Sequence, residues 1–114
     1  MSGSKSRRKG HKYEIDVKNE MIELGYKRCL TSRYESRSKD DAKIDLCYTD
    51  PFSIQCKHVE RLGSLHNILD EMPDDDNINL VFHKRNRKGD IVAMKKEDFY
   101  KIVRLLKKHG ELKI

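Results

Sequence analysis

The apolar positions near the start of the chain predict an amphipathic helix. They recur at intervals of three or four residues, the spacing of one helical face, at Tyr13, Val17, Met21 and Leu24. Gly25 follows at the position where helices commonly end with a left-handed residue. We therefore expect a helix over residues 12–24, preceded by a basic, flexible tail at residues 1–10.

Alternation of apolar and polar residues with a period of two predicts short strands through the rest of the chain. We expect strands over residues 26–33, 42–49, 52–59, 78–84 and 91–95, and further helices over residues 62–72 and 95–110. Asp50 and Pro51 give a turn signal that would join the second and third strands in a hairpin. The order helix, three strands, helix, two strands, helix predicts an α/β fold with a mixed central β-sheet flanked by helices.

The length of 114 residues fits a single domain, which we place at residues 11–114. The chain has 25 Lys and Arg against 19 Asp and Glu, a formal net charge of +6. Such a surplus favours a polyanionic partner, because phosphates release counterions when cations neutralise them. Three cysteines without a CxxC pair indicate reduced thiols. The sequence has no signal-peptide pattern and no long apolar stretch, so we expect a soluble, cytoplasmic protein without a membrane partner.

The predicted hairpin carries polar residues at the centres of its strands, where burial is costly. In its second strand Gln55 and Lys57 share a face, and in its first strand Asp45 lies on the face opposite the apolar residues. Pairing of the two strands would bring Asp45, Gln55 and Lys57 together on one side of the sheet.

These residue types suit chemistry on a phosphodiester. Mg2+ prefers oxygen ligands and keeps several waters, so an Asp45 carboxylate beside the Gln55 amide oxygen fits it. Lys57 could orient or deprotonate a metal-bound water, or stabilise charge on the phosphate. Glu14 lies next to the apolar stripe of the first helix and could add a second carboxylate.

Structural alternatives remain open for each of these features. Glu14 could form an ion pair with Lys18 one turn along the helix, or favour the helix dipole. Asp45 and Lys57 could form a cross-strand ion pair on an exposed sheet face. The cationic stretch at residues 83–89 is expected to be a solvated hairpin turn, with contact to nucleic-acid phosphate as its alternative.

A helix bearing Glu, followed by a hairpin bearing Asp and then a QxK motif, resembles the PD-(D/E)XK nuclease superfamily. The size, the basic start and the order of elements look most like the small Holliday junction resolvases of archaea and phages. The stretch "KGHKYEIDVKNEMIELGY" resembles their opening helix, "DAKIDL" their metal-binding Asp strand, and "FSIQCKHV" their ExK strand. The resemblance covers roughly residues 8 to 105.

The resemblance implies a restriction-endonuclease-like fold and a role for each site residue. Glu14 and Asp45 would be metal-binding acids, and Lys57 would be the catalytic lysine. Gln55 would stand at the usual Glu position, where it supplies an oxygen but no charge, which should weaken metal affinity. The implied cofactor is Mg2+, with Mn2+ as a substitute.

The implied activity is endonucleolytic cleavage of Holliday junctions during DNA recombination and repair, by a homodimer acting in the cytoplasm, or in the host cytoplasm if the chain is phage-encoded. Branched or double-stranded DNA would be the partner. The candidate DNA-binding residues lie in the basic start and in the loop after the first strand: Arg7, Arg8, Lys9, Ser32, Arg33, Arg37 and Lys39. The alternatives are a nicking or flap nuclease of the same superfamily, and a catalytically weak or dead DNA-binding protein.

Overall fold

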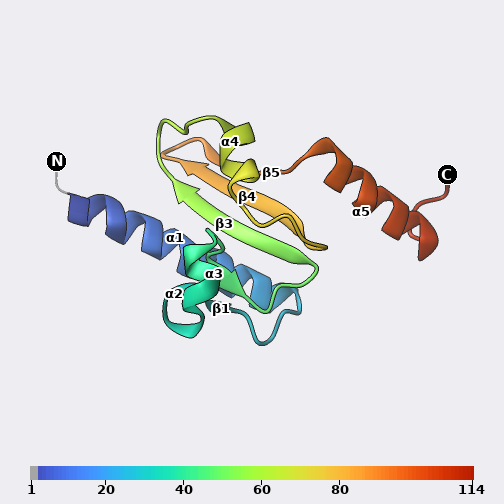
Figure 1. The fold of residues 1–114 in the computed structure, drawn as a ribbon, viewed down its shortest axis with the longest axis horizontal. Helices are drawn as coiled ribbons and strands as arrows, with labels where there is room; N and C mark the ends of the chain where they lie inside the picture. Colours follow the sequence, from blue (N-terminus) through green and yellow to red (C-terminus); the bar gives the residue numbers. More distant parts are fainter. Residues whose placement is uncertain (1–2) are drawn as a thin grey trace.

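A mixed three-stranded sheet forms the centre of the protein (Figure 1). The computed structural model describes residues 3–114. β3 pairs parallel with β4, and β4 pairs antiparallel with β5. An α/β fold with a mixed sheet and helices is therefore confirmed. The elements in chain order are α1 (Gly3–Leu24), β1 (Leu30–Thr31), α2 (Ser32–Glu35), α3 (Arg37–Asp41), β2 (Leu46–Cys47), β3 (Phe52–His58), α4 (Leu65–Asp70), β4 (Ile78–Arg85), β5 (Gly89–Ala93) and α5 (Lys96–Lys108).

The first helix begins well before the expected residue 12. α1 already starts at Gly3, so residues 3–10 are helix in the segment where we expected a tail, and residues 1–2 lie outside the described residues. This stretch has no proline, and its Lys and Arg residues are good helix formers, so the helix propagates from its packed part despite the unfavourable propensity of Gly10. The helix ends as expected, with Gly25 at a φ of 125°.

Two apolar clusters fix the helices to opposite faces of the sheet. Leu80 belongs to the cluster beneath α1, whereas its neighbour Val81 belongs to the cluster beneath α4. Successive residues of a strand point to opposite faces, so α1 and α4 lie on different sides (Figure 1). The α1 cluster contains Tyr13, Val17, Met21, Cys29, Leu46, Ile54, Cys56, Ile78 and Leu80.

The strand expected at residues 42–49 is wrong over most of its length. Only Leu46 and Cys47 are strand, and they pair antiparallel with β1 as a separate two-stranded sheet. Lys43 has a φ of 64°, a left-handed conformation that ends α3 and prevents an extended start. The chain therefore changes direction before residue 46. As a result Ile44 and Leu46 pack in different clusters, although alternation predicted a shared face.

The turn between the second and third predicted strands is confirmed, although the strands do not form a regular hairpin. The backbone N–H of Phe52 donates to the Thr49 carbonyl at 2.9 Å, and the Thr49 hydroxyl donates to the Phe52 carbonyl at 2.7 Å. The peptide bond between Asp50 and Pro51 is cis. Beyond this turn β3 finds its ladder partner in β4.

The expected strand at residues 26–33 is likewise reduced to Leu30–Thr31, and the charged loop after it forms the short helices α2 and α3. The helix expected at residues 62–72 is confirmed over Leu65–Asp70. Ser64 begins it, because its hydroxyl accepts from the backbone N–H of Asn67 at 3.2 Å.

The last helix leaves the sheet instead of covering it (Figure 1). α5 has the predicted apolar face, but the Phe99 side chain is 51% exposed and Leu106 is 39% exposed. Ile102 is the residue of this face that packs against the α1 cluster. The projection contributes to an elongated outline of 50 × 29 × 27 Å. None of the helices within residues 3–114 combines the length and apolar character needed to cross a membrane.

Candidate active site

Asp45 lies at the edge of β3 and takes the place of a neighbouring strand there. Its backbone N–H donates to the Ile54 carbonyl at 2.8 Å, and its carboxylate Oδ2 accepts from the backbone N–H of Cys56 at 2.7 Å. Its own carbonyl accepts from the backbone N–H of Ser32 at 2.8 Å. The residue is thus fixed on both sides, and its carboxylate satisfies a strand-edge donor that would otherwise need water.

Ser32 holds this segment in position and does not face a ligand. Its side chain is fully buried, and its hydroxyl donates to the Ile44 carbonyl. We expected Ser32 to contact DNA, whereas the structure places its side chain in the interior. Because Ser32 bonds to two successive residues, Ile44 and Asp45, it is a positioning residue for the Asp45 carboxylate.

The environment of Asp45 disfavours its charged form. The pKa of this carboxyl is raised to about 6, chiefly by burial and also by the nearby carboxylates of Glu14 and Asp40. The hydrogen bond from Cys56 and the ammonium of Lys57 act in the opposite direction. Asp45 is therefore ionised at neutral pH, but at a cost in stability that a bound cation would relieve.

Glu14 reaches the same region from α1. It is 8% exposed, beside Tyr13, whose ring packs in the core. Its Oε1 lies 3.4 Å from Nη2 of Arg33, and its Oε2 lies 3.6 Å from Nδ1 of His11. Within the described chain Glu14 therefore pairs with Arg33 and His11 and not with Lys18, the partner that helical spacing suggested. The carboxylate is held at the edge of the core, near enough to Asp45 to affect its pKa.

Gln55 points to the face of β3 that lies beneath α4, and it is 4% exposed. Its amide Nε2 donates to the Lys43 carbonyl at 2.8 Å. This bond explains why an amide suits the position, since a glutamate would present a second acceptor to that carbonyl. The remaining polar atom of the side chain, Oε1, is a neutral oxygen donor for a metal.

Lys57 lies two residues further along β3, on the same face as Gln55 and opposite His83 of β4. Its ammonium lowers the pKa of Asp45, so the two groups are neighbours electrostatically. Over residues 3–114 they do not form the direct cross-strand ion pair that the structural alternative required. Lys57 is only partly buried, so the exposed part of its side chain can meet a group that enters from solvent.

The donor set suits a hard cation that keeps most of its waters. The described residues contain no group of three or more His, Cys, Asp and Glu side chains placed to hold a metal ion. Asp45 and Glu14 supply two carboxylates, and Gln55 supplies an amide oxygen. Mg2+ is commonly held by one or two carboxylates with waters and substrate phosphate in the other positions, so these residues fit it.

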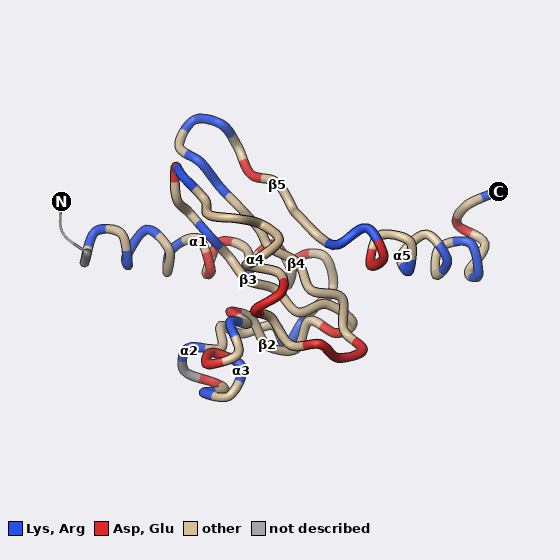
Figure 2. The backbone as a smooth tube through the Cα atoms, turned by 45° about the horizontal axis from the view of Figure 1, so that its top comes forward, with Lys and Arg blue, Asp and Glu red and all other residues tan. Residues whose placement is uncertain are grey.

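The basic residues expected to contact DNA fall into two groups (Figure 2). Arg7, Arg8 and Lys9 lie on the N-terminal half of α1, where Arg7 and Arg8 are exposed. Lys9 is partly buried. This half of α1 leads toward the end of β3, where His58 lies.

The second group follows β1 on the short helices α2 and α3. Arg33 is engaged by Glu14, so it belongs to the candidate active site as well as to its surroundings. Arg37 is exposed, with Nε at 3.9 Å from the Asp41 carboxylate. Lys39 donates its backbone N–H to the Ser36 hydroxyl, and its side chain is partly exposed. Arg37 and Lys39 remain placed to meet phosphate.

Comparisons with family models, with curated proteins and with solved structures found no match to this chain. The arrangement of the site residues is therefore the basis for assigning a function.

Proposed function

We propose that this protein is a metal-dependent, structure-selective DNA endonuclease of the junction-resolving type, with a restriction-endonuclease-like fold. The observation that carries the proposal is that a second carboxylate and an ammonium lie near the Asp45 carboxylate at the edge of β3, while an amide on the opposite face of the sheet from α1 bonds to the backbone just before Asp45. They come from α1, from the segment before β2 and from β3 itself, at Glu14, Asp45, Gln55 and Lys57.

Each side chain has a role that follows from its position. Asp45 and Glu14 hold Mg2+, or Mn2+ in its place, and the Gln55 oxygen completes the protein donors. The cation, when bound, supplies Lewis-acid stabilisation of the phosphate and a more acidic water. Lys57 orients the attacking water or stabilises negative charge on the scissile phosphate. Its position on β3 fixes the start of its side chain before the substrate binds.

The substrate assignment follows from charge and from shape. The cations of α1 and α3 suit contacts with phosphates, and such contacts fix position without reading sequence. Two helices of the described chain carry exposed cations away from the sheet, the N-terminal half of α1 and α5, and in α5 these cations flank an apolar face. Branched DNA recognised through shape and backbone is the substrate that fits this distribution.

A homodimer is part of the proposal, because resolving a junction requires two opposed cuts and each chain supplies one set of site residues. The surface for the second copy is the apolar face of α5. The same chain exposes Val92 of β5 at 46% beside half-buried Phe82, which lies on the α1 side of the sheet, so β5 presents apolar side chains that its own helices leave exposed. Two copies can each supply what the other lacks.

A catalytically inactive DNA-binding protein is the second candidate. Arg33 already neutralises Glu14, and Gln55 adds no charge, so Asp45 is left as the main anion for a cation. A nicking or flap nuclease is the third, since the same site would act on other DNA structures.

Labelled four-way junction, flap and linear duplex separate these candidates when each is incubated with Mg2+, Mn2+ or EDTA. We expect paired, symmetric nicks on the junction that require metal, and loss of cleavage in Asp45→Ala and Lys57→Ala. Cleavage of the flap alone would select the nicking nuclease. Binding without cleavage in either metal would select the inactive binder.

A further inference from the structure

The cationic turn between β4 and β5 is held in place by the end of β3. The backbone N–H of Asn86 donates to the Glu60 carboxylate at 2.6 Å, and the Asn86 side-chain oxygen lies 3.0 Å from Nε2 of His58. His83, at the start of the same stretch, bonds through Nε2 to the Val59 carbonyl at 2.8 Å. These contacts hold the turn in place, although residues 85–89 are exposed to solvent.

The turn also has a defined backbone. Arg87 has a φ of 62° and Gly89 a φ of 77°, and the backbone N–H of Lys88 donates to the Arg85 carbonyl at 3.3 Å. The left-handed residues let the chain reverse tightly. The cations Arg85, Arg87 and Lys88, which we call the basic turn, are therefore presented from a fixed loop.

A groove separates the basic turn from the N-terminal half of α1. Its walls are Lys5, Ser6 and Lys9 from α1, and His58, Val59, Glu60 and Asn86 from the other side. Glu60 is the anion in this groove, and it already has partners. The backbone N–H of Asn86 lowers the pKa of the Glu60 carboxyl, and Lys9, Arg85 and His58 lower it further. Glu60 thus links the two walls.

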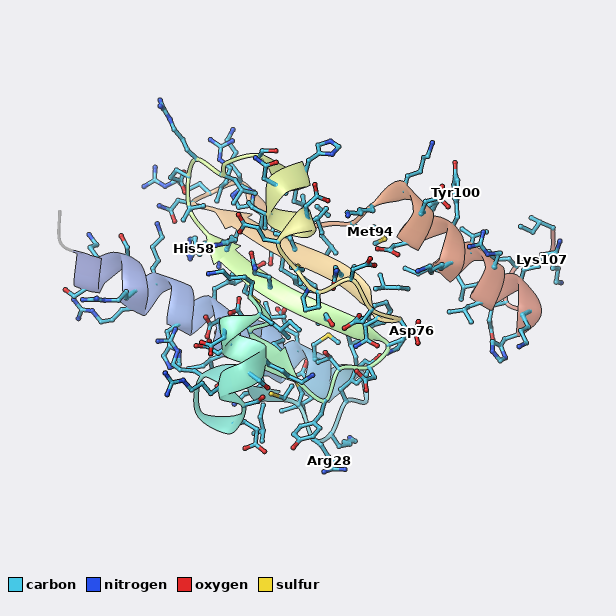
Figure 3. The ribbon with its side chains drawn as sticks, in the orientation of Figure 1. Arg28, His58, Asp76, Met94, Tyr100 and Lys107 are labelled. Atoms are coloured by element: carbon cyan, nitrogen blue, oxygen red, sulfur yellow. The ribbon has the colours of Figure 1, made fainter. Side chains whose placement is uncertain are left out.

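The groove end of the sheet is rich in cations, and the opposite end of the sheet is acidic. Figure 2 shows Lys and Arg along the first half of α1 and at the β4–β5 turn, with acidic residues gathered on the loop before β4. Figure 3 places His58 and Asp76 at opposite ends of the sheet. A polyanion approaching the protein would be steered to the groove end.

From these contacts we infer that the basic turn and the N-terminal half of α1 form a second phosphate-binding surface, which holds the backbone of a double-stranded DNA arm beyond the candidate active site. His58 of the groove directly follows Lys57 in β3, so DNA bound there is continuous with the place of cleavage. The inference rests on the proposed function for its choice of DNA as the polyanion.

The test compares two triple variants with equal loss of charge. Arg85→Ala/Arg87→Ala/Lys88→Ala removes the basic turn. Lys107→Ala/Lys108→Ala/Lys113→Ala removes three exposed cations at the far end of the chain. Binding of a 20-bp duplex is measured by fluorescence anisotropy between 50 and 200 mM salt, about the range over which phosphate contacts lose affinity.

We expect the basic-turn variant to bind at least about tenfold more weakly and to lose about two to three units of salt slope, since each phosphate contact contributes about one unit. The far-end variant should retain the wild-type slope. Equal slopes in the two variants would overturn the inference.

Asn86→Ala keeps every charge but removes the side-chain contact to His58. We expect a several-fold loss of affinity with an unchanged melting temperature, because the turn keeps its backbone contacts but holds the cations less rigidly. Wild-type affinity in this variant would show that a fixed turn is unnecessary, and would overturn that part of the inference.

The outcome is separable from the proposed function. If the wild type binds duplex but cleaves nothing, the proposed activity is wrong, while the two triple variants still decide whether the basic turn binds phosphate. If the wild type cleaves, the basic-turn variant should show a raised KM with kcat retained at saturating DNA. A lowered kcat with unchanged KM would contradict a binding role.

Discussion

The Asp45 carboxylate accepts a 2.7 Å hydrogen bond from the backbone N–H of Cys56. A group proposed to bind metal thus also completes the edge of β3. The structural requirement is only for an acceptor at this point, whereas metal binding requires a negative charge. Substitutions that separate the acceptor from the charge therefore distinguish the two roles.

Asp45→Asn should abolish cleavage and leave the protein as stable as the wild type or more stable. The amide oxygen can still accept from Cys56, while the buried charge is removed. The pKa of Asp45 is raised to about 6 in the folded protein, against about 3.9 for a free Asp, so at pH 7.5 the gain is on the order of 1 to 3 kcal/mol. Urea denaturation in EDTA measures it. Asp45→Ala, which lacks the acceptor, is the matched control and should be less stable than Asp45→Asn.

The stability difference between Asp45→Asn and the wild type should depend on pH in one direction. A raised folded-state pKa means that the native protein retains a proton that the unfolded chain releases. The wild type therefore loses stability as pH rises from about 4 to the folded pKa of about 6, and the loss is complete above it. Denaturation of both proteins in EDTA at several pH values from 3.5 to 7.5 checks this. A constant difference would show that Asp45 titrates normally.

Gln55→Glu should destabilise the protein without metal and increase its response to Mg2+. The variant loses the 2.8 Å hydrogen bond to the Lys43 carbonyl and places an acceptor against it, which costs about 1 to 3 kcal/mol when buried. A bound cation would offset this cost, because it would neutralise the charge of the new carboxylate. Melting temperatures over a Mg2+ titration should rise further in Gln55→Glu than in the wild type.

The control for Gln55→Glu is the double variant with Asp45→Asn, in which the added stabilisation by Mg2+ should largely disappear. An identical Mg2+ response in wild type and Gln55→Glu would exclude Gln55 as a metal ligand.

The sequence predicted the polar residues of the site because they interrupt apolar patterns. Gln55 and Lys57 follow the alternation of β3, and the structure retains their shared face. Glu14 follows from the helical spacing that places Tyr13 in the core. These residues lie in a regular helix and a regular strand, where the direction of each side chain follows from the period of the element.

Asp45 is predicted as a site residue on the assumption that it lies in an extended strand, and that assumption is wrong. Alternation assumed an extended chain from residue 42, and a single left-handed residue, Lys43, removes that assumption. A lysine gives no signal for this conformation. Ser32 was mistaken for a surface residue because it lies among charged neighbours, and its burial depends on the distant Ile44 carbonyl. Contacts between segments far apart in the chain have no local pattern.

Lys57→Ala should lower kcat by a factor on the order of 100 to 10,000, with KM nearly unchanged, because proton transfer or charge stabilisation occurs in the transition state. Lys43→Ala is the matched control, since Lys43 is exposed in the preceding turn and contributes its carbonyl rather than its ammonium. Single-turnover cleavage of the junction measures both. Equal losses in the two variants would indicate general weakening of DNA binding instead of a role in the reaction.

Phe99→Ser/Leu106→Ser should convert a dimer to a monomer. Both side chains lie on the apolar face of α5, the helix that projects from the sheet, and they are 51% and 39% exposed. Truncated apolar contacts at the centre of an interface commonly cost about 2 kcal/mol or more each, so the pair should weaken association by about a thousandfold. Light scattering after size-exclusion chromatography, over a dilution series, gives the mass directly.

Leu24→Ser is the matched control for this pair, because Leu24 is an apolar residue that is 78% exposed at the end of α1 and is not part of the α5 face. It should remain dimeric. The α5 variant should still nick a junction once while losing paired nicks within one binding event, since a monomer carries one set of site residues. A wild type that is monomeric at all concentrations, yet makes paired nicks, would show that the second copy is recruited by the junction and not by α5.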